Sequence, residues 1–388
     1  MIEYMVADNN LYSYAERDIN EMEAGWSDRF DGYMVVFLYP VSVESSYAPR
    51  QEDYDEDPRL LLISRDERTN VISSRVLKRY DRSLDPTDPE VMNRVIADAM
   101  TLAPAENYAL IFWSHGSGWL PRGMGQPLKS AVPTAWDGSK LTGPMVENPG
   151  IAYSFGQSNS YDNAEMEIDA LAGALPKETV FDFILFDACH MACIEVAWEL
   201  KDRTKYLIAS AAETLADGFP YEAILAPMFE TEADVTAIGK AFFDYYNEQS
   251  GAWQSATVGV VRSDRLTEVA AAMRALCETE ISADGISYAA QQYGRRAMGF
   301  ENTFYDLTNF VQQTWGASDP AGVARFEAAM KEAVAYQAAT PWLFDQLRVL
   351  THCGLSCYLP RSSTPLSLEA YRTRFGWSEA SGMGQLLP

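Results

Sequence analysis

The sequence predicts an α/β protein built on a mostly parallel sheet with helices on both faces. Short apolar runs alternate along the chain with amphipathic helical stretches, which is typical of strands that are buried on both sides. The 388 residues are 47% hydrophobic and 12% aromatic, so the chain can bury a large core. Disorder is therefore excluded as a description of the whole chain.

The strands and helices can be placed in chain order from these patterns. The strand candidates are short runs of apolar residues, at Ile2–Val6, Met34–Tyr39, Leu60–Ser64, Ala109–Trp113, Phe183–Phe186, Tyr206–Ala209 and Ala256–Val261. The helix candidates carry apolar residues every three or four positions, at Tyr12–Ala24, Pro89–Leu102, Glu165–Leu175, Met191–Lys201, Asp234–Asn247 and Arg265–Glu280.

The C-terminal third has a different pattern. After Asp264 it is largely helical, with Phe326–Ala339 as the clearest helix, and a short extended segment follows at Cys353–Leu359. We therefore expect residues 1–260 to form the main domain. Residues 261–388 are expected to form a mainly helical C-terminal subdomain that ends in a short strand.

The charge of the chain limits its partners. There are 30 Lys and Arg residues against 55 Asp and Glu residues, a net charge of −25, which repels nucleic acids and anionic lipid surfaces. Cationic partners are favoured, although an acidic surface can also serve solubility alone. No apolar run approaches the roughly 20 residues of a membrane span, and the chain opens without a signal-peptide pattern.

The five cysteines are Cys189, Cys193, Cys277, Cys353 and Cys357. Because their number is odd and the chain is long, a disulfide framework is not expected and at least one thiol should be free. His352 beside Cys353 and Cys357 is a weak zinc signal, since no second pair of ligands accompanies it. We expect no metal there.

One histidine and one cysteine follow predicted strands directly. His115 comes after Ala109–Trp113, and Cys189 comes after Phe183–Phe186. The carboxyl ends of parallel strands emerge at one edge of a sheet, where ligand sites gather, so we expect these two side chains to be neighbours.

The two residues suit nucleophilic catalysis. A thiolate attacks a carbonyl carbon, and an imidazole with a pKa near 6.5 can take its proton and return one to the leaving amine. The N–H groups of Gly116 and Cys189 can face the developing oxyanion. An isolated cysteine or histidine is more often a core residue. His190 and His352 do not follow a strand into a glycine turn, and Cys193 has apolar neighbours typical of the core.

Two segments make the chain resemble a known family. They are Tyr108–Trp119 (YALIFWSHGSGW) and Phe186–Leu200 (FDACHMACIEVAWEL), which resemble the paired signature of the clostripain family of cysteine peptidases. Tyr4–Leu11, Ala209–Tyr221 and Gly354–Pro360 are similar to further segments of that family, so the resemblance covers nearly the whole chain. That family shares a fold group with caspases, gingipains and legumain.

The resemblance implies a caspase-like three-layer α/β/α sandwich and a Cys-His dyad with no obligatory third carboxylate. It assigns His115 as the base, Cys189 as the nucleophile and Gly116 as an oxyanion neighbour. The family usually has an apolar residue after the cysteine, and here it is His190. No cofactor is implied to be required, and calcium is left open.

The resemblance also implies an S1 pocket for Arg or Lys. Asp187 matches the family position at the base of that pocket, and Asp217 is a candidate second wall. The alternative is that Asp187 only caps a following helix. The expected partners are therefore proteins or peptides with a basic P1 residue.

A long segment between the two signatures suggests self-cleavage. Leu120 to Gly150 is rich in glycine and proline and far exceeds an ordinary loop of roughly 4 to 6 residues. Members of the family that the chain resembles are known for self-cleavage between the strands that carry the His and the Cys. Lys129 is the first candidate, Lys140 the second and Arg122 the third, although any exposed loop also attracts other proteases.

The sequence thus predicts a clostripain-like cysteine endopeptidase that cuts after Arg or Lys. The alternatives are a non-catalytic surface binding protein on the same fold and a transpeptidase or ligase. Family relatives are commonly exported from bacteria, so we expect a secreted or cell-envelope location, with the signal region absent from this sequence.

Overall fold

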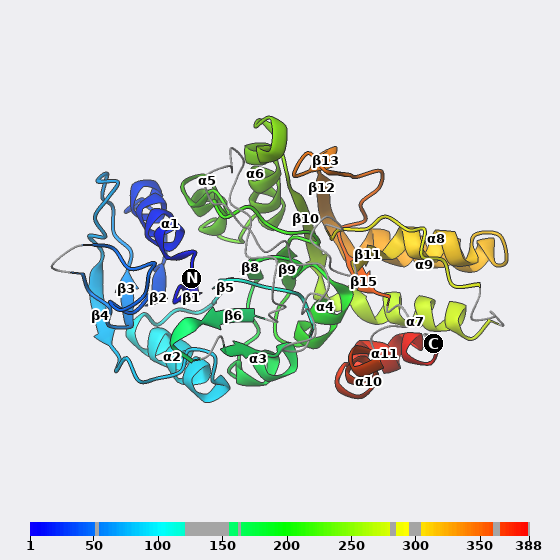
Figure 1. The fold of residues 1–388 in the computed structure, drawn as a ribbon, viewed down its shortest axis with the longest axis horizontal. Helices are drawn as coiled ribbons and strands as arrows, with labels where there is room; N and C mark the ends of the chain where they lie inside the picture. The colour runs from blue at the N-terminus through cyan, green and yellow to red at the C-terminus, as the bar shows by residue number, and fades with distance from the viewer. Residues whose placement is uncertain are drawn as a thin grey trace.

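A nine-stranded sheet forms the centre of the protein (Figure 1). It is seen in a computed structural model that describes residues 1–50, 54–120, 155–161, 164–279, 285–294, 304–359 and 365–386. The strands lie in the order β12-β10-β9-β8-β5-β1-β2-β3-β4. Neighbours from β9 to β2 pair in parallel, whereas β10, β12, β3 and β4 pair antiparallel. The predicted α/β class is confirmed.

The central strands are buried at every position, as expected for strands covered on both faces. The sheet consists of β1 (Ile2–Val6), β2 (Val35–Tyr39), β3 (Arg59–Leu62), β4 (Arg75–Arg79), β5 (Leu110–Trp113), β8 (Ile184–Asp187), β9 (Tyr206–Ala209), β10 (Thr257–Arg262) and β12 (Val334–Ala339). Three smaller pairs are β6 (Phe155–Ser158) with β7 (Ala164–Met166), β11 (Phe304–Asp306) with β15 (Ser356–Tyr358), and β13 (Trp342–Leu343) with β14 (Leu347–Arg348).

Helices form a layer on each face of the sheet (Figure 1). One layer holds α1 (Tyr12–Gly25), α5 (Tyr221–Met228) and α6 (Val235–Asn247). The other holds α2 (Pro89–Leu102), α3 (Ile168–Ala174) and α4 (Ile194–Leu200). The start of α2 shows why a helix forms there, because the Asp88 side chain accepts the Glu90 N–H at 2.7 Å and Pro89 occupies the first turn.

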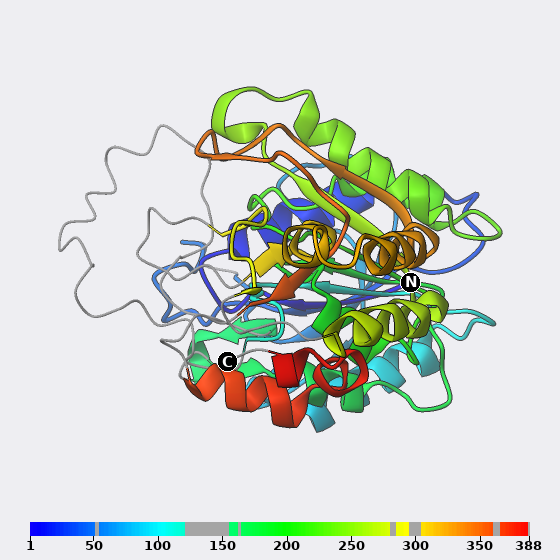
Figure 2. The same cartoon turned by 90° about the vertical axis from the view of Figure 1, so that its right-hand side faces the viewer.

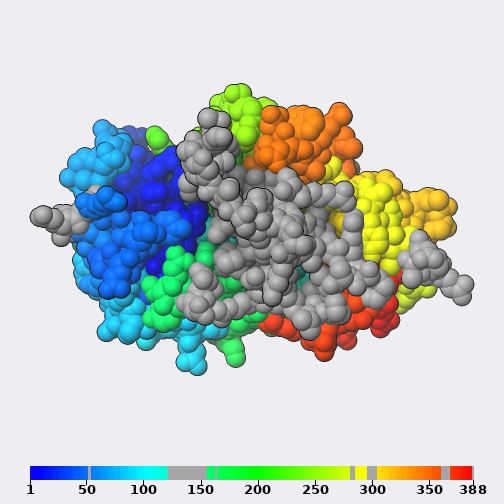
Figure 3. Space-filling view, in the orientation of Figure 1, coloured from blue at the N-terminus to red at the C-terminus, as the bar shows by residue number. Residues whose placement is uncertain are grey.

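The C-terminal third adds a group of helices at one end of the molecule, shown in yellow to red (Figures 1 and 3). They are α7 (Leu266–Cys277), α8 (Leu307–Trp315), α9 (Pro320–Ala333), α10 (Pro365–Arg374), α11 (Gly376–Ser381) and α12 (Met383–Leu386). The same third supplies β12 to the central sheet. The proposed boundary at residue 260 stays a prediction, but the expectation that this part ends in a short strand is wrong, because α10, α11 and α12 follow β15. No described helix is long and apolar enough to cross a membrane.

Several predicted helices are too long. In the predicted helix Glu165–Leu175, the first residues belong to β7 and α3 begins at Ile168. Two further helices are shortened by pairing with distant segments. The segment Phe326–Ala339 was expected to be helical throughout, but α9 ends at Ala333 and the chain continues as β12, paired with β10. The segment Met191–Lys201 is helical only from Ile194. The backbone of Ala192 instead forms hydrogen bonds with distant segments. Its N–H donates to Ser210 O, and its carbonyl accepts from Ser356 N. Tertiary pairing overrides helix propensity in both places.

The register of three central strands defines a functional edge. Trp113 of β5 lies opposite Asp187 of β8 and opposite Met5 of β1. All three strands therefore end at nearly the same level, and the residues that follow them emerge together. Figure 2, turned by 90°, shows the sheet from the side of the C-terminal helices, with helices above and below it.

Candidate active site

His115 and Cys189 follow paired ends of β5 and β8. The Ser114 N–H donates to Asp187 O at 3.4 Å, so the two segments that follow β5 and β8 lie side by side where they leave the sheet. At Gly116 there is no room for a side chain, because a Cβ there would lie 2.8 Å from the carbonyl oxygen of Cys189. Glycine is therefore required for the turn after His115 to contact the backbone of the cysteine. The backbone directly after His115 therefore lies against the backbone of Cys189.

The His115 ring is held by an amide side chain that the sequence did not single out. Its Nε2 lies 2.8 Å from Oδ1 of Asn10. In the tautomer with the proton on Nε2, this N–H donates to the amide oxygen and Nδ1 is the basic nitrogen of the ring. A contact of this kind favours that tautomer of the histidine.

Asn10 belongs to a turn that is itself firmly bonded. In this turn after β1, Asn9 donates to Val6 O at 3.2 Å and to Gln157 O at 3.0 Å. Asp8 is buried and accepts from the Ser158 hydroxyl at 2.7 Å. The end of β1 is thereby tied to β6, which follows the long loop in the sequence.

The Cys189 thiol is buried, with 2% of its surface exposed. The Thr214 N–H donates to its Sγ at 3.0 Å, and the thiol can donate to Thr214 O at 3.7 Å. A backbone N–H aimed at sulfur favours the thiolate over the thiol. Thr214 lies in the loop after β9, so a fourth strand end contributes to the same edge.

His190 is held in a turn directly after Cys189. It adopts a left-handed conformation with φ 61°. Its N–H donates to Ala212 O at 2.9 Å, and its ring stacks on Phe304 with the centroids 4.9 Å apart. The Phe304 ring also closes over Gly118, where a Cβ would meet it at 3.0 Å. One aromatic ring of β11 thus contacts both catalytic loops.

Trp119 anchors the His115 loop to the C-terminal third. Its side chain is fully buried, with ring centroids 4.4 Å from Tyr358, 5.3 Å from Tyr371 and 5.1 Å from Phe375. Aromatic pairs at such distances add to the energy of burial. The described chain before the long loop is therefore fixed on both sides of His115.

Asp187 is buried beside the loop after β9 and does not cap a helix. Its Oδ2 accepts the Phe219 N–H at 2.9 Å and lies 3.3 Å from the Tyr221 hydroxyl. The helix α4 starts seven positions later, with Cys193 at its N-cap and no side-chain cap. The capping alternative is therefore wrong. Gly218, with φ 61°, is required here because a Cβ would lie 2.5 Å from Oδ2.

Asp217 is already paired. Its Oδ1 lies 2.7 Å from Nη1 of Arg17 on α1, and 16% of the Asp217 side chain is exposed. Nearby Tyr246 donates its hydroxyl to Gly218 O at 2.6 Å, which fixes the loop that carries Asp217. The cation of Arg17 offsets the negative charge that a second pocket wall would offer.

The remaining cysteine and histidine candidates have structural partners. His352 lies 2.7 Å from the Tyr293 hydroxyl and 3.1 Å from Val258 O, and burial lowers the pKa of its ring. Burial also raises the pKa of Cys353 to about 12. Among the described residues, no group of three His, Cys, Asp or Glu side chains could hold a metal ion.

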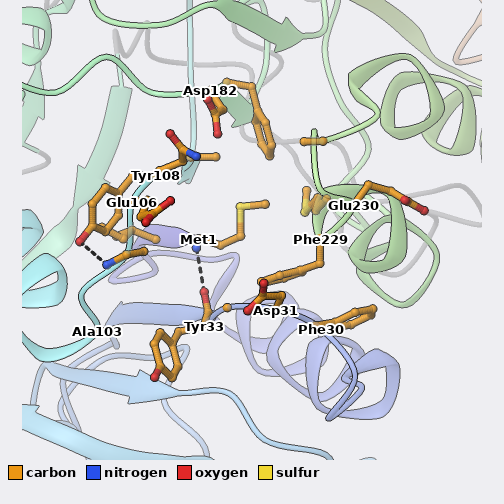
Figure 4. A pocket seen from close by; sticks show the side chains of 18 of the residues that line it. Met1, Phe30, Asp31, Tyr33, Ala103, Glu106, Tyr108, Asp182, Phe229 and Glu230 are labelled. Carbon is orange, nitrogen blue, oxygen red and sulfur yellow. Dashed lines mark hydrogen bonds between the residues drawn. The ribbon is translucent and has the colours of Figure 1, made fainter.

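A cavity of about 900 Å³ lies at the opposite, amino edge of the sheet (Figure 4). It is lined by the starts of β1 and β8, by Phe229 and by acidic residues such as Glu106. In Figure 4, a dashed line joins the backbone nitrogen of Met1 to the carbonyl oxygen of Tyr33, which accepts its hydrogen bond at 2.7 Å. None of the predicted site residues lines this cavity.

Three predicted residues lie outside the described part of the chain. They are the self-cleavage candidates Lys129, Lys140 and Arg122. The described ends of this segment are placed, since Gly116 forms a β-bridge with Phe155 and Gly156 N donates to His115 O at 3.0 Å. The described residues on either side of the segment thus lie next to the strand end that carries His115.

A comparison with protein families now decides which family the chain represents. The model of the clostripain family, of the C11 peptidases, matches residues 3–376. The chain belongs to the clostripain family. The resemblance seen in the sequence is thereby confirmed.

Individual members of the clostripain family agree. Clostripain of Hathewaya histolytica is 26% identical over 270 residues, which are 64% of this chain and 47% of clostripain, so the match spans about half of that relative. The structure of an inactive zymogen C11 protease from Parabacteroides distasonis has a TM-score of 0.75 and 27% identity, covering 98% of this chain and 96% of that one. A clostripain from Bacteroides thetaiotaomicron, in complex with the peptide inhibitor BTN-VLTK-AOMK, has a TM-score of 0.50 and 25% identity, covering 58% and 98%.

Proposed function

We propose that the protein hydrolyses peptide bonds after Arg or Lys with a dyad of Cys189 and His115. The observation that carries the dyad is the contact of Gly116 with the Cys189 carbonyl, which brings the residue after the histidine against the nucleophile. Thr214 N–H stabilises the thiolate, and Asn10 leaves Nδ1 of His115 to take and return the proton.

The reaction follows from these positions. The Cys189 thiolate attacks the scissile carbonyl carbon, and the N–H groups of Gly116 and Cys189 are the proposed donors to the oxyanion. Protonated His115 then donates to the leaving amine, and water hydrolyses the thioester. No step needs a cofactor, and a role for calcium stays a prediction.

The proposed basic specificity depends on Asp187. This carboxylate is buried two residues before the nucleophile and is bonded by Phe219 and Tyr221, so it has a fixed direction. The inhibitor bound to the Bacteroides thetaiotaomicron clostripain is the peptide VLTK, which ends in lysine. Peptide and protein substrates with a basic P1 residue are therefore the proposed partners. Asp217 is a weaker candidate because Arg17 neutralises it.

A positional peptide library tests the specificity most completely. The expected profile has Arg and Lys dominant at P1, with neutral residues cut slowly. A profile with an apolar or acidic P1 would contradict the proposal. Adding a free amine separates hydrolysis from transpeptidation, since a hydrolase should give the carboxylate product alone.

We also propose self-cleavage in the segment from 120 to 150, with Lys129 before Lys140 and Arg122. The ends of this segment lie at the catalytic edge, and the Parabacteroides distasonis relative was solved as an inactive zymogen. Purified wild type should separate into two fragments on a denaturing gel, whereas Cys189→Ala should stay whole. Identical nicking of Cys189→Ala would mean that another protease cuts the loop. A secreted location stays a prediction.

A further inference from the structure

A pair of buried side chains lies behind Asp187, on the side away from the nucleophile's strand end. Tyr221 begins α5, and its hydroxyl lies 3.3 Å from Asp187 Oδ2 and 3.1 Å from Glu3 Oε1. Glu3 is in the middle of β1 and fully buried. The three groups form a chain from the centre of the sheet to the proposed S1 floor.

The number of protons shared by the side chains of Glu3, Tyr221 and Asp187 follows from their hydrogen bonds. A tyrosine hydroxyl has a single hydrogen and can donate it to only one of its two carboxyl neighbours. If both carboxyls were ionised, one of them would face the lone pairs of the hydroxyl oxygen in a buried site. That arrangement leaves a buried charge unsatisfied, which is costly. One of the two carboxyls therefore carries a proton.

The surroundings assign the proton to Glu3. Oδ2 of Asp187 also accepts the Phe219 N–H, as an ionised carboxylate prefers. Among the described residues, Glu3 Oε2 has no hydrogen-bond partner. Burial, and then the charge of Asp187, raise the pKa of Glu3 well above its usual range. Asp18 accepts the Trp113 indole N–H at 2.7 Å, and burial and then the charge of Asp187 raise its pKa in the same way.

We propose that Glu3 and Tyr221 are positioning residues for Asp187: protonated Glu3 donates to the Tyr221 oxygen, and Tyr221 donates to Asp187, which keeps that carboxylate ionised for a basic P1 side chain. The inference rests on the proposed role of Asp187 in the S1 pocket. It adds two residues that touch neither the substrate nor the dyad. Their effect is therefore expected in P1 selectivity rather than in the chemistry of the thiol.

Three variants test the chain, each assayed with matched Arg, Lys and Leu P1 peptides. Tyr221→Phe should lower kcat/KM about tenfold for Arg and Lys, because a hydrogen bond to a charged group is lost, and leave the Leu peptide within about twofold. Glu3→Leu should behave in the same way. Glu3→Gln should retain the wild-type ratio, because its amide NH₂ donates to the Tyr221 oxygen as a protonated carboxyl does.

The outcomes separate this inference from the specificity proposal. If Glu3→Gln loses as much selectivity as Glu3→Leu, Glu3 acts through a negative charge. The assignment of the proton to Glu3 would then be wrong. Suppose that Tyr221→Phe keeps the wild-type ratio of kcat/KM for basic and Leu P1 peptides while Asp187→Ala loses selectivity. That result would overturn the proposed roles of Glu3 and Tyr221 but not the role of Asp187. If Asp187→Ala itself keeps the basic preference, the specificity proposal fails first.

A spectroscopic readout covers the case in which Glu3→Leu does not fold. The infrared difference spectrum of wild type minus Glu3→Gln should contain the C=O band of a protonated carboxyl, because bands from other buried carboxyls such as Asp18 cancel in the difference. The same band should remain in the spectrum of Asp187→Asn. A difference spectrum without a protonated-carboxyl band would contradict the assignment.

Discussion

The two edges of the parallel strands offer very different surroundings to a ligand. At the carboxyl edge, Asn10, His115, Cys189 and Thr214 come from four strand ends and are fixed by hydrogen bonds. At the amino edge, a cavity of about 900 Å³ is lined by aromatic and acidic side chains, and no cysteine or histidine is among its described lining residues. Directed donors and acceptors, rather than empty volume, favour the carboxyl edge as the reactive site.

The largest expected effect is at the carboxyl edge. Cys189→Ala and His115→Ala should each lower kcat by about 10⁴-fold or more. The two residues act as one unit, so removing either one disables both. Circular dichroism and thermal unfolding should show an intact fold in both. His190→Ala is the matched control, since its ring stacks on Phe304, and it should keep most of the activity. An equal loss in this control would move the base to His190.

The next effect concerns the charge at the proposed pocket floor. Asp187→Ala should lower kcat/KM for Arg and Lys peptides roughly 30-fold or more, since truncating one partner of a buried charge pair costs about 2 to 5 kcal/mol. A peptide with a neutral P1 should lose little. Asp217→Ala is the control and should have a smaller effect, because Arg17 already neutralises it. If Asp217→Ala lowered kcat/KM for basic peptides more than Asp187→Ala, the pocket floor would be assigned to Asp217.

A smaller effect is expected from the residue that orients the base. Asn10→Ala removes one hydrogen bond to His115, and a loss of roughly 1.4 kcal/mol corresponds to about a tenfold lower kcat. Asn10→Asp keeps an acceptor in the same place and should retain most of the rate. KM should stay nearly unchanged in both variants. A kcat equal to wild type in Asn10→Ala would show that Asn10 does not orient the ring.

The smallest effect is expected at the amino edge. Ala105→Phe would fill part of the cavity, and kcat/KM should stay within about twofold of wild type, because changes away from special contacts alter free energies by about 0.5 kcal/mol or less. The P1 profile should be identical. A large loss of activity in this variant would couple the two edges and break the comparison.

The sequence predicted the centre of the sheet better than its margins. β1, β5 and β8 are continuous apolar runs, so their position and burial follow from hydrophobic pattern. β4 was missed because its Arg-Val-Leu-Lys-Arg sequence is largely exposed at the sheet edge and carries no such run. β12 was taken as helix because its residues include good helix formers, and only its pairing with β10 makes it a strand.

The site shows a similar division. His115, Gly116 and Cys189 could be proposed because the strand ends, the glycine and the family resemblance are visible in the sequence. Asn10 lies 105 positions from His115, and Glu3 lies 218 positions from Tyr221. Such partners depend on how distant loops are placed in space, and no periodicity or local signal encodes that.

Covalent labelling of Cys189 tests the central claim most directly. A peptide acyloxymethyl ketone with Lys at P1 should modify Cys189, identified by mass spectrometry, much faster than the same peptide with Leu. Cys353, which is partly exposed, should remain unmodified as an internal control. His115→Ala should slow the labelling strongly. Labelling of Cys353 in place of Cys189, or equal rates for the Lys and Leu probes, would contradict the account.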